Sequence, residues 1–189
     1  DLALPDGVGL KMAGWLMGVN FKRITGADLL KDILAIAVAQ NRRVAVFNWR
    51  SGLSSSEDIR RMLAEKYKNL QALAVEVEQG AAMSEDELRR VKEFRPDIIF
   101  STLGAPYQEK FIFYNLPNLP TAKIGMGVGG SFDFLTGKLS RAPQVLRIIG
   151  LEWLWRLIKQ PRRWRRIYNA VIVFPVKFLI FYCKNLSQL

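Results

Sequence analysis

Residues 97–133 constrain the fold most, because they contain two short apolar runs that each end in a glycine-containing loop. The first run, Asp97–Phe100, leads into Leu103-Gly104-Ala105-Pro106, and the second, Ala122–Ile124, leads into Gly125-Met126-Gly127-Val128-Gly129-Gly130. Runs this short, bounded by glycine and proline, are typical of buried parallel strands. Because ligands bind beyond the carboxyl ends of such strands, both loops are predicted to open into one crevice.

The glycines of these loops would let backbone N–H groups approach a phosphate closely. The pattern Gly125-x-Gly127-x-x-Gly130 also matches a dinucleotide fingerprint, but it falls late in the chain, and Arg141-Ala142-Pro143 interrupts the helix that should follow it. A phosphate-binding loop of another kind is therefore favoured over a nicotinamide site. The candidate binding glycines are Gly104, Gly127, Gly129 and Gly130.

The remaining pattern of residues 1–140 alternates apolar runs with amphipathic segments. Leu2–Gly9 is interpreted as a strand end that enters a turn. Two strands are predicted, at Val44–Phe47 and Leu73–Val77. The second should lie nearer an edge of the sheet, because it contains a charged residue. Helices are expected over residues 10–17, 29–39 and 56–67, and from Ser84, which forms a capping box with Glu87. This order predicts an α/β fold with a Rossmann-like, mostly parallel sheet and helices on both faces.

The positive charge of the chain gathers near its C-terminal end. Residues 141–189 hold ten Lys/Arg and one acid, Glu152, which gives them +9 of the total +11. We therefore divide the chain into a Rossmann-like catalytic domain, residues 1–140, and a C-terminal appendage, residues 141–189. A basic appendage indicates an anionic partner: membrane lipid, nucleic acid or a phosphorylated substrate.

The appendage combines basic and apolar segments. One helix is predicted over residues 145–160, and Pro161 interrupts it before Arg162-Arg163-Trp164-Arg165-Arg166. The apolar run that follows, Ile167–Cys183, has 17 positions and contains Asn169, Pro175 and Lys177, whereas a spanning helix needs about 20 apolar residues. A helix lying in the headgroup region fits this pattern, and packing on the protein itself or on a second subunit is the alternative.

Composition excludes several classes of protein. Half of the residues are apolar, which excludes disorder, and one cysteine and no histidine exclude an internal disulfide and a Cys/His zinc site. The sequence has no Asp-x-Asp motif to hold a divalent metal beside a diphosphate, so backbone N–H groups, Arg or Lys would have to neutralise a phosphorylated ligand instead.

Six blocks of residues carry a family resemblance: Pro5–Gly9, Arg23–Leu29, Leu103–Lys110, Gly127–Asp133, Arg141–Pro143 and Gly150–Leu157. In their order and spacing they resemble the WecG/TagA/CpsF family of bacterial glycosyltransferases. Tyr107 departs from the pattern where the family often has lysine, as do Asn48 and Trp49 where it usually has a glycine pair.

The resemblance implies an inverting, metal-independent transferase that uses no cofactor. Its donor would be a UDP-linked sugar of the N-acetylmannosamine type, and its acceptor N-acetylglucosaminyl-diphospho-undecaprenol, in cell-surface polymer synthesis. The resemblance makes Asp6 the general base and places Arg23 and Gln108 in the substrate pocket. From spacing alone, Asp6 is a turn-forming aspartate, and Arg23 and Gln108 are solvated residues. Asp133 would bond the ribose or base, or else cap the segment after Gly130.

The resemblance also gives the appendage a role at the membrane. We expect a cytoplasmic protein held peripherally on the inner face of the cell membrane, and a homo-oligomer stays open. The arginines expected at the anionic membrane surface or the leaving diphosphate are Arg156, Arg162, Arg163, Arg165 and Arg166.

Two alternatives remain. The chain begins with Asp1, inside a motif, so we expect that an N-terminal segment present in the family is missing, and a non-catalytic fragment or remnant is one alternative. The other is a basic nucleic-acid-binding protein. We disfavour nucleic acid as a partner because a soluble binder would not expose the apolar run.

Overall fold

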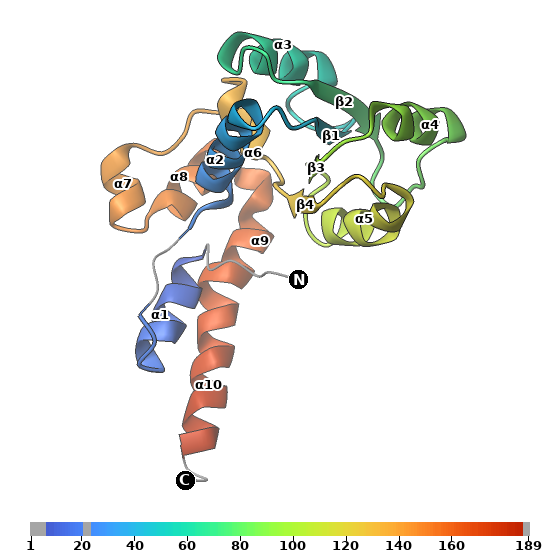
Figure 1. The fold of residues 1–189 in the computed structure, drawn as a ribbon. Helices are drawn as coiled ribbons and strands as arrows, with labels where there is room; N and C mark the ends of the chain where they lie inside the picture. Colours follow the sequence, from blue (N-terminus) through green and yellow to red (C-terminus); the bar gives the residue numbers. More distant parts are fainter. Residues whose placement is uncertain (1–6, 21–23, 187–189) are drawn as a thin grey trace. The chain divides into compact units, whose positions relative to one another are not determined.

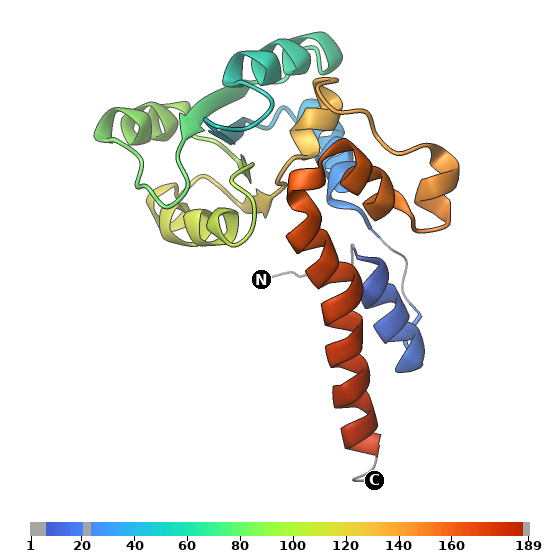
Figure 2. The same cartoon turned by 180° about the vertical axis from the view of Figure 1, so that it is seen from behind.

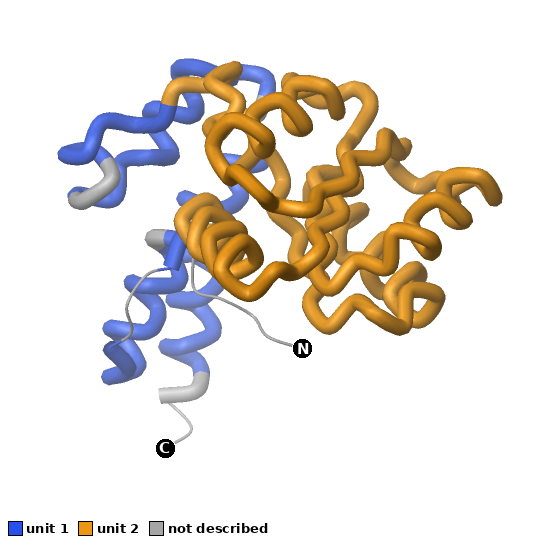
Figure 3. Tube along the Cα trace, turned by 45° about the horizontal axis from the view of Figure 1, so that its top comes forward, with its two compact units in different colours: residues 1–25, 141–189 blue, residues 26–140 orange. Residues whose placement is uncertain are grey.

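The computed structural model describes residues 7–20 and 24–186, and these divide into two compact units. One unit spans Gly26–Ser140, and the other joins the first 25 residues to Arg141–Leu189 (Figure 3). The assignment of residues 1–140 to a catalytic domain stays a prediction.

The unit of residues 26–140 is built on a four-stranded parallel sheet with the strand order β2-β1-β3-β4 (Figure 1). This strand order confirms the predicted α/β class, the parallel sheet and the edge position of the strand predicted at Leu73–Val77. The strands are β1 (Val44–Trp49), β2 (Ala72–Val77), β3 (Ile98–Ser101) and β4 (Ile124–Gly127). The helical segments of this unit are α2 (Gly26–Ala39), α3 (Ser56–Lys66), α4 (Glu85–Phe94), α5 (Tyr107–Asn115), η1 (Leu116–Asn118) and α6 (Ser131–Leu135).

Helices cover both faces of the sheet because its central strands, β1 and β3, are apolar on both sides. Val44 and Val46 of β1 pack toward α2, α3 and α6, whereas Ala45 and Phe47 pack toward α4 and α5. Successive side chains of a strand point to opposite faces, so a continuous apolar run supplies two cores at once. Phe132 of α6 belongs to the first core.

Two capping boxes fix the beginnings of the helices that flank β2. Ser84 accepts a hydrogen bond from the backbone of Glu87, whose side chain accepts one from Ser84 N, as the sequence predicted. An equivalent pair, Ser55 and Asp58, begins α3. Each box satisfies two backbone donors that the first helical turn leaves without partners.

The strand β4 begins later in the chain than its sequence predicts. The prediction ended the strand at Ile124, but Gly125 and Gly127 belong to it. Both glycines lie against α5: a Cβ on Gly125 would come within 2.6 Å of Ile112 Cγ2, and one on Gly127 within 2.6 Å of Gln108 Cδ. Glycine therefore continues this strand because α5 leaves no room for a side chain.

The other unit is helical and contains a long C-terminal helix. The predicted strand end and turn at Leu2–Gly9 lie outside the described residues as far as Asp6, and the turn is wrong for Val8 and Gly9, which begin a helix. The predicted single helix of residues 145–160 is two helices, separated at Gly150, whose φ of +81° is left-handed. The helical segments are α1 (Val8–Leu16), α7 (Gln144–Ile148), α8 (Glu152–Lys159), η2 (Pro161–Arg163), α9 (Trp164–Tyr168), η3 (Asn169–Val173) and α10 (Phe174–Leu186).

The segments α9, η3 and α10 follow one another without a break. The middle segment is a π-helix, and it contains Val171, the residue four positions before Pro175. Proline lacks an N–H and its ring clashes with that carbonyl in a regular α-helix, so the wider turn accommodates Pro175. The stretch Trp164–Lys184 is 21 residues long with a mean hydropathy of 1.5, and by length and composition it could cross a membrane.

The short helix α1 packs along this long helix, as both Figure 1 and Figure 2 show. A Cβ on Gly9 would lie 3.1 Å from Phe174 Cδ1, and the Tyr182 hydroxyl donates to the carbonyl oxygen of Leu16 at 2.9 Å. The close approach at Gly9 and the hydrogen bond at Leu16 join the two helices at both ends of α1. Large apolar side chains of the pair stay exposed, including Trp15, Met17, Val176, Ile180 and Phe181.

Candidate functional site

The loops that follow β3 and β4 reach the same edge of the sheet, as their sequence predicts. The two strands are parallel neighbours, with Ser101 opposite Gly127. Directly beyond them, Val128 N donates to the carbonyl oxygen of Ser101 at 2.9 Å. Both predicted glycine loops therefore begin side by side at the carboxyl edge, where open α/β sheets bind their ligands.

Gln108, in the first turn of α5, connects the two loops. Its side-chain oxygen accepts a hydrogen bond from Gly129 N at 3.0 Å, and its Nε2 donates to Glu109 Oε1 at 2.7 Å. The residue is 8% exposed. Gln108 therefore holds the backbone of the glycine loop rather than extending into solvent. The prediction that it also contacts a substrate stays open.

The backbone of both loops uses conformations that suit glycine. Gly104 has a φ of +75° and Gly129 a φ of +49°, in the left-handed region that residues with a Cβ rarely adopt. Glycine is needed at position 127 for a different reason, because Gln108 occupies the space that a larger side chain would fill. Gly130 directly precedes α6. The four candidate glycines thus lie in or beside the two loops.

A buried hydrogen-bond network, which sequence reasoning missed, extends this edge to β1. The Thr102 hydroxyl donates to Asn48 Oδ1 at 3.0 Å and accepts a hydrogen bond from Trp49 N at 2.8 Å. Asn48, 3% exposed, also donates from Nδ2 to the carbonyl oxygen of Ser54 at 2.8 Å. The available signal was a polar residue at the end of the apolar run Val44–Phe47, because a buried amide needs partners.

The network continues to the carboxylate of Asp133. Ser54 Oγ donates to Asp133 Oδ1 at 2.8 Å and lies 2.8 Å from Thr136 Oγ1. Asp133 is 8% exposed in the first turn of α6. One of its oxygens is thus engaged in joining α6 to the loop after β1. Its bond to a ribose or base stays a prediction.

The chain matches a known protein family over nearly its whole length. The model of the "Glycosyl transferase WecG/TagA/CpsF family" matches residues 1–187. This chain belongs to that family. The resemblance read from the sequence blocks is therefore confirmed.

Curated relatives of this family member share about a third of its residues. One, from Bacillus subtilis (strain 168), is 31% identical over 173 residues, covering 89% of this chain and 65% of the relative. Another, from Staphylococcus aureus (strain MRSA252), is 31% identical over 177 residues, covering 91% and 66%. Both are named N-acetylglucosaminyldiphosphoundecaprenol N-acetyl-beta-D-mannosaminyltransferase. The chain thus spans just under two thirds of the length of these relatives.

Two of the site residues that the family resemblance implies, Asp6 and Arg23, lie outside the described residues. Their roles stay predictions. Among the residues that the structure does describe, no group of three or more His, Cys, Asp or Glu side chains could hold a metal ion.

The predicted arginines of this family member belong to the helical unit. Arg156 is half-buried on α8, and Arg162, Arg165 and Arg166 are exposed, with the Arg165 guanidinium 5.4 Å from the centre of the Trp164 ring. The side chain of Arg163 lies outside the described part of the chain. A contact between these arginines and a diphosphate stays a prediction.

Proposed function

We propose that this family member transfers a sugar of the N-acetylmannosamine type from a UDP donor to N-acetylglucosaminyl-diphospho-undecaprenol. The observation that carries the proposal is the glycine loop after β4, held by Gln108 against the loop after β3. The names of the relatives from Bacillus subtilis and Staphylococcus aureus supply the sugar and the lipid-linked acceptor. The product would enter the synthesis of a cell-surface polymer.

The donor's diphosphate would lie at the backbone of the glycine loop. Backbone N–H groups stabilise developing negative charge without reorganising, and glycine lets phosphate oxygens approach them. Gln108 fixes the loop by its bond to Gly129 N, so the donors would be in place before the substrate arrives. The leaving group would then depart without a divalent metal, its charge neutralised by these donors and by arginines of the appendage.

Asp6 would act as the general base. Its carboxylate would take the proton of the acceptor hydroxyl, whose own pKa lies far above neutrality. The oxygen would form a bond to the anomeric carbon as the bond from that carbon to UDP breaks, so UDP leaves and the configuration inverts. Arg23 and Gln108 would position the two substrates.

The acceptor's lipid would hold the reaction at a membrane, so the enzyme has to reach the bilayer. The helical unit supplies suitable features, because exposed apolar side chains such as Ile180 and Phe181 follow the exposed bases Arg162, Arg165 and Arg166 along the chain. Basic residues attract anionic lipid while an apolar helix enters the interface. We propose a peripheral protein on the inner face of the cell membrane.

Turnover of donor and lipid acceptor tests this function. The full chain should form the disaccharide lipid from UDP-N-acetylmannosamine in the presence of EDTA, and Asp6→Asn should lower kcat at least about a hundredfold. Asp32→Asn, an exposed carboxylate on α2, is the matched control and should keep the parent rate. Lack of transfer from every UDP-sugar in a donor screen would favour the non-catalytic alternative, and undiminished turnover by Asp6→Asn would remove that residue from the mechanism.

A further inference from the structure

The outer edge of β2 is open among the residues that the structure describes. Val44 N donates to the carbonyl oxygen of Gln71 at 2.9 Å, and Arg50 N to that of Val77 at 3.1 Å, so the odd-numbered residues of this strand bond to β1. The backbone groups of Ala72, Ala74 and Glu76 consequently face away from the sheet. An unpaired edge without proline is a template for another strand.

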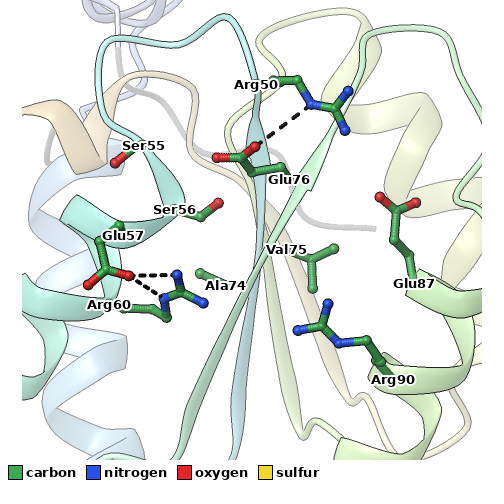
Figure 4. Close-up of a pocket in the computed structure, with 10 residues that line it drawn as sticks. All are labelled: Arg50, Ser55, Ser56, Glu57, Arg60, Ala74, Val75, Glu76, Glu87 and Arg90. Atoms are coloured by element: carbon green, nitrogen blue, oxygen red, sulfur yellow. Dashed lines mark hydrogen bonds and ion pairs between the residues drawn. The ribbon is translucent and has the colours of Figure 1, made fainter.

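A groove of about 380 Å³ lies along this edge, between α3 and α4 (Figure 4). Figure 4 shows Glu57 and Arg60 on the α3 side of the strand and Glu87 and Arg90 on the α4 side. Each helix thus presents one acid and one base, three residues apart, to the same groove. The pattern is neutral on each wall, which disfavours a strongly charged occupant.

The charges are complementary to a second copy of the same surface. A two-fold axis perpendicular to the sheet at Ala74 would place each helix beside its own copy, running in the opposite direction. The acid of each helix would then face the base of its copy, Glu57 toward Arg60 and Glu87 toward Arg90. These contacts would add to the partners that the acids have within one chain, where Glu57 Oε2 lies 2.6 Å from Arg60 Nη2 and Glu87 Oε2 accepts a hydrogen bond from Ser84 N. Such reciprocal pairing is what an isologous interface requires.

The backbone register is compatible with the same axis. An antiparallel pair centred on Ala74 would place Glu76 opposite Ala72 of the second copy, so no like charges would lie directly opposite one another. Glu76 keeps its ion pair with Arg50, whose Nε lies 3.7 Å from Glu76 Oε2.

We propose that two copies of this chain associate through β2, pairing antiparallel to form one continuous sheet flanked by α3 and α4 of both copies. The interface lies wholly within the unit of residues 26–140. It is independent of sugar transfer, and it leaves the carboxyl ends of β3 and β4, on the far side of β1, uncovered.

Sedimentation velocity of the full chain in mild detergent, over a range of concentrations, measures this association. The parent should reach about twice its monomer mass of 21.6 kDa. Arg60→Glu with Arg90→Glu should raise the dimer dissociation constant at least about tenfold, because like charges would then meet across the axis. The control variant, Arg61→Glu with Arg89→Glu, changes the net charge by the same amount at two positions outside the groove. Its dimer dissociation constant should stay within about twofold of the parent's.

A charge swap separates pairing from damage to the fold. Glu57→Arg with Arg60→Glu keeps the net charge and an opposite pair on α3, so this variant should dimerise with itself as the parent does. Mixed with the parent, it should form the heterodimer at least about tenfold more weakly. A parent that stays monomeric, a groove variant that associates as strongly as the parent, or a control variant that dissociates equally would each overturn the proposal, leaving an extended segment of another protein as the remaining occupant.

Discussion

At the residue scale, Gln108 has a larger structural role in the candidate site than its position at the beginning of a helix indicates. A glutamine in the first turn of a helix is usually solvated, yet this one is buried and accepts a hydrogen bond from Gly129 N. The glycine at position 127 makes this arrangement possible, because Gln108 occupies the space of its missing side chain. The two residues should therefore be coupled energetically.

Gly127→Ala tests that coupling. The new Cβ would lie 2.6 Å from Gln108 Cδ and 2.8 Å from Cγ, so urea unfolding should show a loss of about 1–3 kcal/mol. In a Gln108→Ala background the loss should fall by at least half, since the clashing atoms are gone. Gly125→Ala meets Ile112 instead, and Gln108→Ala should not rescue it. Equal rescue of both glycine variants would contradict a specific Gly127–Gln108 contact.

Ser54→Ala tests the network that ends at Asp133. The substitution removes the hydroxyl that donates to Asp133 Oδ1, and losing a hydrogen bond to a buried carboxylate costs about 1.5–3 kcal/mol. Ser51→Ala, at an exposed position in the same loop, should change the free energy of unfolding by less than about 0.5 kcal/mol. Equal effects of the two substitutions would show that the network adds nothing to stability.

At the element scale, the beginning of α3 should respond to pH. Asp58 accepts hydrogen bonds from the backbone N–H and hydroxyl of Ser55 and lies 3.2 Å from Lys138 Nζ. The Ser55 backbone hydrogen bond, then the hydroxyl and Lys138, lower the pKa of Asp58 below its ordinary 3.8. A lowered folded-state pKa gives stability that is present above pH 3.8 and lost as pH falls through the lower value.

Thermal unfolding of Asp58→Asn, measured from pH 7 to below pH 3.8, tests the direction of this pH dependence of stability. The variant should melt below the parent at pH 7, because it lacks the charge that Lys138 and the helix beginning stabilise. The difference should shrink as pH falls below 3.8, where the parent carboxylate becomes protonated. A difference that stays constant with pH would mean that the charge of Asp58 is not what stabilises α3.

The arginines at the beginning of the long C-terminal helix are predicted to bind anionic membranes. Replacing Arg162, Arg163, Arg165 and Arg166 by glutamate should abolish co-sedimentation with anionic vesicles, since each base near such a surface contributes about 1 kcal/mol. The parent's binding should weaken as salt rises. The same charge change at Arg61, Lys68, Arg89 and Lys92, in the other unit, should leave binding nearly unchanged. Equal losses in both variants would remove the arginines from a specific membrane role.

At the scale of the whole molecule, the sequence predicts the sheet better than it predicts the site. Val44–Phe47 and Asp97–Phe100 are short apolar runs, and both became central parallel strands with a core on each face. The start of β4 escaped prediction because Gly125 and Gly127 have no β-propensity of their own, and only the approach of α5 explains them. Gly150 likewise divided a periodic pattern into two helices.

The site was predicted where it depends on local motifs and missed where it depends on distant contacts. The two glycine loops could be placed together because parallel strands share a carboxyl edge. Asn48 and Ser54, in contrast, meet Thr102 and Asp133 only after folding, across 54 and 79 positions of sequence. A buried polar residue indicates that partners exist, but periodicity does not indicate which ones.

The central proposal is that the glycine loop after β4 binds the donor's diphosphate without a metal. Titration calorimetry of UDP against the full chain in EDTA tests it most directly, comparing the parent with Gly127→Ala and the Ser51→Ala control, each folded by circular dichroism. We predict that the parent and the control bind UDP, and that Gly127→Ala raises the dissociation constant at least about tenfold, equivalent to about 1.4 kcal/mol. Binding that requires a divalent metal, or that Gly127→Ala leaves unchanged, would contradict it.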